Sequence, residues 1–177
     1  KFRKQHLKKN NQIIYYSENL KDKRIIENLI ENFLIDNNSF VFESVEKGKV
    51  RGRYTIFGKN PDKIWELKKN KVYLFKKQTK KIINKSPYTF LKQMVEEFKF
   101  QTPKNLPPIC SLLAGFFSYD IIRYVEKIPN NCVDDLNLPD VRILRPTSLI
   151  ILDNVKKKIF FIVNCYCDER INNYQSR

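Results

Sequence analysis

The segment from residue 40 to residue 58, FVFESVEKGKVRGRYTIFG, places a carboxylate, a hydroxyl group and two guanidinium groups close together in the chain. Glu43 and Ser44 end one alternating apolar run, and Arg51 and Arg53 precede the next one. These groups can hold a small polar ligand, and they can equally pair with one another. In the second case Glu43 and one arginine form a cross-strand ion pair, worth under about 1 kcal/mol if exposed, and Ser44 is a turn residue. Spacing alone favours this structural interpretation.

The sequence offers few residues for the common kinds of catalytic site. The one histidine, His6, lies in a basic N-terminal segment, so Ser-His-Asp, Cys-His and histidine-metal arrangements are not expected. The four cysteines include a C-x-C pair, which is the wrong spacing for a zinc or redox half-site, and we expect them to be reduced and structural. They are Cys110, Cys132, Cys165 and Cys167. We predict no catalytic residue and no metal ligand in the chain.

Length and composition predict a globular protein. The chain has 177 residues, of which 42% are apolar and 13% aromatic, enough for one well-buried core. The net charge of +15 comes mostly from lysines spread along the whole chain, without an RNA-binding aromatic motif or a zinc finger. We therefore expect no nucleic-acid partner. No apolar run approaches the roughly 18 residues that span a membrane, and no secretory signal is visible, so we expect no membrane partner and a cytoplasmic location.

Hydrophobic periodicity predicts both strands and helices. An amphipathic helix is expected where apolar residues recur from Ile25 to Leu34, and a second one over 86–100, with Ser86 as N-cap and Pro87 at the first position. A short helix begins near residue 121 and is followed by a long loop. The strands are expected at 12–17, 39–45, 53–58, 64–67, 72–75, 109–120, 141–153 and 157–166, with the run over 109–120 in the centre of a sheet and turns at 59–62, 68–71 and 154–157.

This order of elements predicts an α+β fold, with mostly antiparallel sheet packed by a few helices, in a single domain. Residues 1–38 would contribute a basic segment, a strand and a helix to the same domain, and residues 39–167 would form its core. The polar tail at 168–177 has helical character and no ending signal. We expect it to begin a linker to a further domain.

Three blocks resemble anthranilate synthase component I, a member of the chorismate-utilising enzyme family. Residues 40–65 resemble its N-terminal segment, which usually reads S-F-L-L-E-S-V-E-G-G, then R-G-R-Y-S, then G-x-x-P-D-x-x-W. Residues 106–130, LPPICSLLAGFFSYDIIRYVEKIPN, resemble L-P-P followed by G-Y-x-G-Y-D-x-x-R-x-x-E-x-L-P. Residues 134–159 resemble L-G-L-P-D, R-P and the closing D-x-V-K strand pair. The blocks occur in the family's order over most of the chain.

The resemblance implies that the full protein converts chorismate and ammonia into anthranilate and pyruvate with Mg²⁺. A partner glutamine amidotransferase subunit would deliver the ammonia. In this family the residues that bind chorismate and Mg²⁺ lie in a C-terminal domain, which is absent from these 177 residues. The chain by itself is therefore expected to be inactive.

The resemblance also implies a tryptophan effector site at the family's Leu-Leu-Glu-Ser motif, which here is Val41-Phe42-Glu43-Ser44. Glu43 would accept hydrogen bonds from the ammonium group and Ser44 would bond either polar group, beside the apolar Phe42. Arg53 is favoured over Arg51 as the partner of the carboxylate, and both stay open. With the resemblance, the effector site is favoured over the ion pair.

Three other interpretations remain. Aminodeoxychorismate synthase component I of the folate pathway shares the fold, and only the Glu-Ser and R-G-R-Y-T blocks favour anthranilate synthase. A basic nucleic-acid-binding module would fit the charge. A freestanding regulatory domain that binds an amino acid is the third.

Overall fold

A computed structural model describes residues 11–20, 24–43, 52–98, 102–129, 131 and 133–166. These residues form two compact units. Unit 1 takes residues 1–60, 100–111 and 147–177, and unit 2 takes residues 61–99 and 112–146. Two long strands, β3 (Tyr54–Lys68) and β7 (Val141–Asp153), run through both units.

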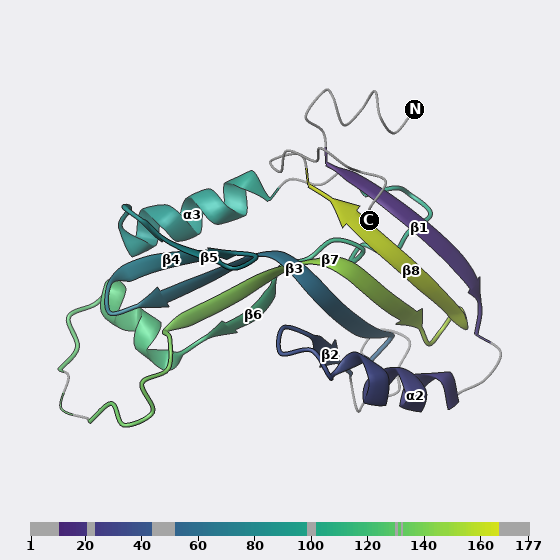
Figure 1. The fold of residues 1–177 in the computed structure, drawn as a ribbon, viewed down its shortest axis with the longest axis horizontal. Coiled ribbons are helices and arrows are strands. Elements are labelled where there is room, and N and C mark those ends of the chain that lie inside the picture. The colour runs from purple at the N-terminus through teal and green to yellow at the C-terminus, as the bar shows by residue number, and fades with distance from the viewer. Residues whose placement is uncertain are drawn as a thin grey trace. The chain divides into compact units, whose positions relative to one another are not determined.

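Unit 1 contains β1 (Gln12–Asn19), α2 (Arg24–Phe33), β2 (Phe40–Phe42) and β8 (Lys158–Cys165), together with one half of β3 and of β7. Its strands are hydrogen-bonded in the order β1-β8-β7-β3-β2. The pairs β1–β8, β7–β8 and β2–β3 are antiparallel. Figure 1 shows α2 beside the short β2, below β7 and β8. The sequence predicted each of these elements.

The core of unit 1 forms where α2 packs on one face of its strands. Phe33 meets Phe57 edge to face at 5.6 Å between ring centroids, over the fully buried Leu152 and the buried Ile159. Alternating residues of a strand point to opposite faces, and the apolar stripe of a helix covers only one of them. The helical spacing of Ile26, Leu29, Ile30 and Phe33 is therefore explained by this cluster.

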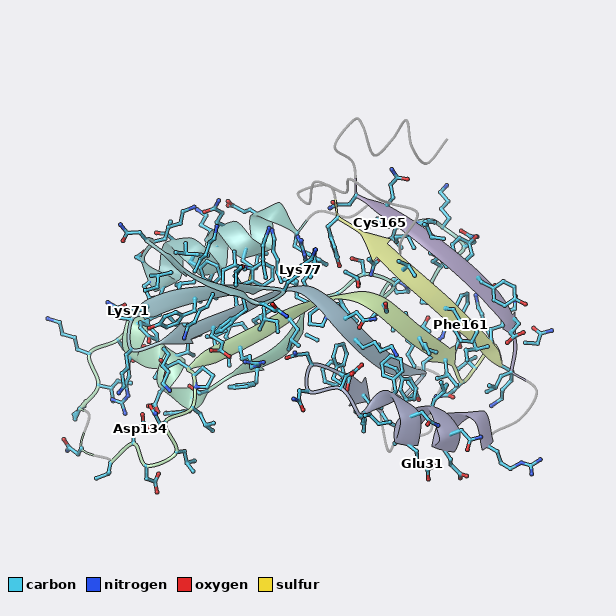
Figure 2. The ribbon with its side chains drawn as sticks, in the orientation of Figure 1. Glu31, Lys71, Lys77, Asp134, Phe161 and Cys165 are labelled. Carbon is cyan, nitrogen blue, oxygen red and sulfur yellow. The ribbon has the colours of Figure 1, made fainter. Side chains whose placement is uncertain are left out.

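Unit 2 contains β4 (Lys71–Lys76), β5 (Thr79–Ile83), α3 (Pro87–Glu97), β6 (Ala114–Phe117) and the 3₁₀ helix η1 (Tyr119–Tyr124), together with the other half of β3 and of β7. Its strands are hydrogen-bonded in the order β6-β7-β3-β4-β5, and the pairs β3–β4, β4–β5 and β6–β7 are antiparallel. The β3–β4 hairpin turns at Lys69 and Asn70, which both have positive φ angles. Figure 2 labels Lys71, the first residue of β4, and Lys77, the residue that follows its end.

Helix α3 begins as predicted. The Ser86 side chain accepts a hydrogen bond from the backbone N–H of Thr89, and Pro87 occupies the first turn. Phe90 and Met94, one turn apart, are buried against Trp65, Leu67 and Val72 in the core of unit 2. A proline at this place removes no helical hydrogen bond, because the first N–H groups of a helix have no partner within it.

Two strand predictions were wrong. Residues 59–62 do not form a turn, because β3 continues through them although Asn60 has a φ of 53°. The Thr147 hydroxyl donates to the Asn60 carbonyl at 2.6 Å, which ties this irregular point to β7. The run over 109–120 is not a central strand. Only Ala114–Phe117 is a strand, and in the described residues it pairs with β7 alone.

The mostly antiparallel α+β fold is confirmed. β5 is a strand that the sequence did not predict, since its lysine-rich residues are exposed and show no apolar alternation. No helix among the described residues is long and apolar enough to cross a membrane. The tail at 168–177 lies outside the described residues, and so does His6.

Candidate functional site

The pairing of β2 with β3 positions the first half of the predicted effector site. Phe40 lies opposite Gly58, and a Cβ atom on Gly58 would meet the Phe40 ring at 2.1 Å, so glycine is required for this ring position. The rings of Phe40 and Phe42 are 4.8 Å apart. Phe42 is 47% exposed and Glu43, the next residue, is also exposed. An apolar ring and a carboxylate are therefore accessible together at the end of β2.

Arg53 lies just before β3 and forms a bidentate ion pair with Asp153 at the end of β7. Its Nη2 is 2.7 Å from Oδ2, and its Nε is 3.2 Å from both carboxylate oxygens. The Arg53 guanidinium also lies 4.8 Å from the Tyr54 ring centroid. The Asp153 side chain is 2% exposed and that of Arg53 is 30% exposed, so the pair is open to solvent only on the arginine side.

Asp153 also organises the turn that joins β7 to β8. Its Oδ1 accepts hydrogen bonds from the backbone N–H groups of Val155, at 3.1 Å, and Lys156, at 2.9 Å. Burial by itself raises the pKa of Asp153, but the hydrogen bonds from Arg53 and these N–H groups outweigh it and hold the pKa below its usual value. The same hydrogen bond to Asp153 raises the pKa of Arg53. Asp153 stays ionised and Arg53 charged at neutral pH.

The structure places three of the five predicted effector residues. Phe42 and Glu43 lie at the end of β2 and Arg53 before β3, whereas Ser44 and Arg51 lie outside the described residues. The carboxylate that binds Arg53 belongs to Asp153 and not to Glu43. Sequence reasoning gave no role to Asp153. The available signal was the D-N-V-K turn, because an aspartate before a turn commonly accepts backbone hydrogen bonds.

A second bidentate ion pair joins two of the sequence blocks within unit 2. Arg145 donates from Nε to Asp62 Oδ1 at 2.8 Å and from Nη2 to Oδ2 at 2.6 Å, with side chains 9% and 2% exposed. Its guanidinium carbon lies 5.9 Å from the Trp65 ring centroid. Three positions of the motifs G-x-x-P-D-x-x-W and R-P thus make one buried cluster.

Three charged residues, Asp120, Arg123 and Glu126, follow β6 at intervals of three. Arg123 Nε donates to Asp120 Oδ1 at 2.6 Å, and its Nη1 donates to the carbonyls of Ile128 and Pro129. Asp120 and Glu126 are exposed. These hydrogen bonds hold the loop after η1 in place. They are typical of an exposed ion pair and do not indicate a catalytic group.

Among the described residues, no three His, Cys, Asp or Glu side chains come together in a way that could hold a metal ion. Cys110 and Cys165 are both buried, and burial raises the pKa of the Cys110 thiol. A raised pKa leaves Cys110 with little of the reactive thiolate form at neutral pH. Cys132 and Cys167 lie outside the described residues.

Comparison with known proteins gives consistent relatives, although no family model matches the chain. The anthranilate synthase component 1 of Cereibacter sphaeroides is 35% identical over 127 residues, which are 69% of this chain and 25% of that protein. The protein of the same name from Acetivibrio thermocellus is 33% identical over 144 residues, 81% of this chain and 29% of that protein. The anthranilate synthase alpha subunit 1 of rice, a chloroplast protein, is 34% identical over 147 residues. The chain therefore spans about a quarter of the length of these relatives.

A comparison with solved structures agrees with the sequence comparison. The crystal structure of anthranilate synthase component I from Streptococcus pneumoniae superposes with a TM-score of 0.58 and 24% identity, over 75% of this chain and 28% of that one. At this identity the structural match supports the fold alone. The relationship to the family rests on the sequence relatives. By sequence and by fold, the chain is related to the N-terminal region of anthranilate synthase component I.

Proposed function

We propose that this chain is the N-terminal regulatory region of an anthranilate synthase. The longer protein would convert chorismate and ammonia into anthranilate and pyruvate, and a glutamine amidotransferase subunit would supply the ammonia. The observation that supports this most strongly is sequence identity of 33–35% to anthranilate synthase component 1 over 69–81% of the chain.

The second part of the proposal is a tryptophan feedback site at the end of β2. The exposed Phe42 ring offers an apolar wall and Glu43 offers an acceptor for the ammonium group. Ser44 would bond either polar group of the amino acid. Tryptophan would inhibit by binding more tightly to one arrangement of the longer protein than to another, with a coupling free energy of about 1 to 3 kcal/mol.

The effector's carboxylate needs a cation, and the structure changes how the two arginines compare. Arg53 already binds a carboxylate through its Nε and Nη2, and Asp153 is nearly fully buried behind it. A ligand carboxylate could reach only the exposed side of Arg53 and would compete with Asp153. The choice between Arg51 and Arg53 is best made by mutating each in turn.

The decisive experiment uses the longer protein with its amidotransferase subunit. Glutamine- or ammonia-dependent anthranilate formation, inhibited by tryptophan, would support both parts of the proposal. The 177-residue chain alone should show no anthranilate formation. If the product is aminodeoxychorismate, the assignment to the tryptophan pathway fails, and if anthranilate forms without any response to tryptophan, only the feedback site fails.

Single substitutions then test the site. Ser44→Ala should raise the tryptophan concentration needed for half-inhibition about tenfold and leave the uninhibited rate unchanged, since one hydrogen bond to a charged group contributes about 1.5 kcal/mol. Arg51→Gln should act the same way if Arg51 binds the carboxylate. Ser39→Ala is the matched control, because its hydroxyl bonds the Asp36 carbonyl within a turn. An unchanged tryptophan response in Ser44→Ala would contradict the proposed effector site.

A further inference from the structure

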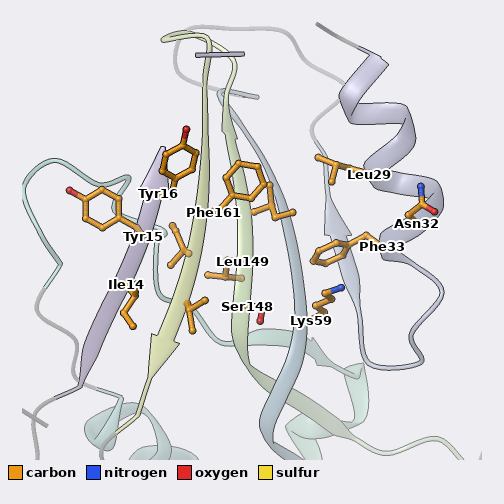
Figure 3. Close-up of a pocket in the computed structure, with 13 residues that line it drawn as sticks. Ile14, Tyr15, Tyr16, Leu29, Asn32, Phe33, Lys59, Ser148, Leu149 and Phe161 are labelled. Carbon is orange, nitrogen blue, oxygen red and sulfur yellow. The ribbon is translucent and has the colours of Figure 1, made fainter. Parts of the chain in front are cut away.

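A groove in unit 1 lies beside α2 on the face of the sheet that this helix partly covers. Its volume is about 560 Å³, within the range of small-molecule sites. Figure 3 shows Leu29 and Phe33 of α2 on one side and Tyr16 of β1 on the other, with Phe161 of β8 between them. The lining residues are Ile14, Tyr15, Tyr16, Leu29, Asn32, Phe33, Lys59, Ser148, Leu149, Ile150, Phe161, Ile162 and Val163.

The groove lies where α2 leaves part of this face of the strands uncovered. The strand registers align three rows of side chains on this face: Leu152 with Ile159, then Ile150 with Phe161 and Tyr16, then Ser148 with Val163 and Ile14. The first row is buried under α2. Tyr16 is 62% exposed and Ile14 is 47% exposed, at the far end of the second and third rows. An apolar surface of this kind, bounded by a helix, has room for a ligand.

The residues that line the groove carry positive charge only. Of the residues that line it, Lys59 alone carries a charge, and none is a carboxylate. The Lys59 Nζ lies 4.8 Å from the centroid of the Phe33 ring, so the cation is held over a ring at the wall of the groove. The other polar groups there are neutral, namely Asn32, Ser148 and the two tyrosines. An anion beside Lys59 would therefore find an attractive charge in the groove wall. The Glu18 carboxylate accepts a hydrogen bond of 3.4 Å from the Tyr16 hydroxyl but does not line the groove.

This groove is separate from the effector site proposed above. Val41 packs with Phe33 and Phe57 on the α2 side of the sheet. Because successive residues of a strand point to opposite faces, Phe42 points away from that side. The groove therefore does not use Phe42, and Glu43 does not line it.

We infer that this groove binds a small aromatic carboxylate, with the ring between Tyr16, Phe161 and Phe33 and the carboxylate on Lys59. The two halves of such a ligand match the two features of the groove. An aromatic ring gains from stacked or edge contacts with aromatic walls. The carboxylate gains a charge-assisted hydrogen bond from the ammonium group at the rim.

The test compares 3-phenylpropanoate with its uncharged amide on the purified protein, with backbone amide signals followed by NMR. The acid should bind with a dissociation constant of about 1 mM or tighter, as expected for a ligand of this size. The backbone amide signals of Ile14, Tyr16 and Val163 should shift when the acid binds. The amide should bind about tenfold more weakly, because it loses the charge-assisted bond to Lys59.

Substitutions assign the charge. Lys59→Met keeps the aliphatic stem and should weaken binding of the acid about tenfold while leaving the amide unchanged. Lys63→Met is the matched control, because Lys63 also lies over a ring, that of Trp65 at 5.9 Å, but does not line the groove. Tyr16→Ser should weaken the binding of both the acid and the amide. Urea midpoints show whether each variant is still folded.

Equal affinity for acid and amide, or an unchanged affinity for the acid in Lys59→Met, would overturn the inference. Absence of shifts at the groove residues in the unmodified protein would do the same.

Discussion

Arg145 and Asp62 form a buried bidentate ion pair, with N–O distances of 2.8 and 2.6 Å, although 83 positions separate them in the chain. The pair connects the two strands that run through both units, β3 and β7, at a point within unit 2. Loss of one partner leaves a buried charge without its counterion, which costs more than the pair contributes.

Removing the charge of Asp62 should therefore be severe. We expect Asp62→Asn to lower the free energy of unfolding by about 3 to 5 kcal/mol, measured by urea titration. Asp120→Asn is the control, since its pair with Arg123 is exposed and should contribute under about 1 kcal/mol. The double variant Asp62→Leu with Arg145→Met should recover most of the loss, because it removes both charges. A double variant as unstable as Asp62→Asn would contradict this account.

The pair of Arg53 and Asp153 predicts a loss of stability in acid. The folded-state pKa of Asp153 lies below its usual value, so its contribution is complete above about pH 4, the pKa of the unfolded chain. It is lost as the pH falls through the lower, folded-state pKa. We expect the free energy of unfolding to fall more steeply below pH 4 in the unmodified protein than in Asp153→Asn. Parallel profiles between pH 2 and 7 would show that another group is responsible.

The same pair predicts different effects for the two candidate effector arginines. Arg53→Gln breaks the bidentate contact and leaves Asp153, which is 2% exposed, without its cation. We expect a lower melting temperature in this variant, and a weaker response to tryptophan only if Arg53 also binds the effector. Arg51→Gln, compared in the same thermal and inhibition assays, identifies which arginine serves the effector. An unchanged melting temperature in Arg53→Gln would contradict a structural role for the pair.

Tyr124 predicts a loss of stability in alkali. Burial, together with its hydrogen bond of 2.7 Å to Asp140, raises the pKa of Tyr124 to about 12. A raised folded-state pKa means that the contribution is complete below about pH 10, where tyrosine of the unfolded chain ionises, and is lost as the pH rises toward 12. Spectrophotometric titration at 295 nm should show a late step near pH 12 from Tyr124, in addition to the delayed ionisation of Tyr54, whose pKa burial also raises. Tyr124→Phe should remove that late step, and Tyr88→Phe, at an exposed position, should not.

Two glycines offer a matched comparison of backbone and side-chain obstruction. A Cβ atom on Gly115 would lie 1.9 Å from the backbone carbonyl oxygen of Arg142 on β7, whereas one on Gly58 would meet only the Phe40 ring. A backbone obstacle cannot move without breaking the β6–β7 pairing, and a ring can turn aside. We expect Gly115→Ala to cost more than about 3 kcal/mol and Gly58→Ala about 1 to 2 kcal/mol, in urea unfolding. The reverse order would contradict the described packing.

Local signals in the sequence predicted most elements correctly. Ser86 and Pro87 marked the start of α3, and the apolar recurrence ending near Phe33 marked α2. The lysine-rich turn before Lys71 was predicted as a hairpin because two apolar strands flank it, and Lys69 and Asn70 there have the positive φ angles of such turns. These features depend on neighbours within a few residues, which a sequence shows directly.

Predictions that depended on distant partners failed or were absent. Asn60 and Pro61 carry turn chemistry, but contacts from Thr147 on β7 keep the strand extended through them. The apolar run near Phe116 predicted a central strand, yet β6 is short, pairs with β7 alone among the described residues and leaves Phe116 43% exposed. In each case, packing between segments far apart in the chain overrides local propensity.

The sequence by itself determined the class of fold, the kinship with anthranilate synthase component I and the chemical types at the end of β2. Periodicity and motif spacing are local properties, so they could be read without coordinates. Only the tertiary structure decided that Arg53 binds Asp153, that Asp62 binds Arg145 and that Lys59 lies at the wall of an apolar groove. These contacts join residues that the register of distant strands brings together, and strand register is set by packing across the whole sheet.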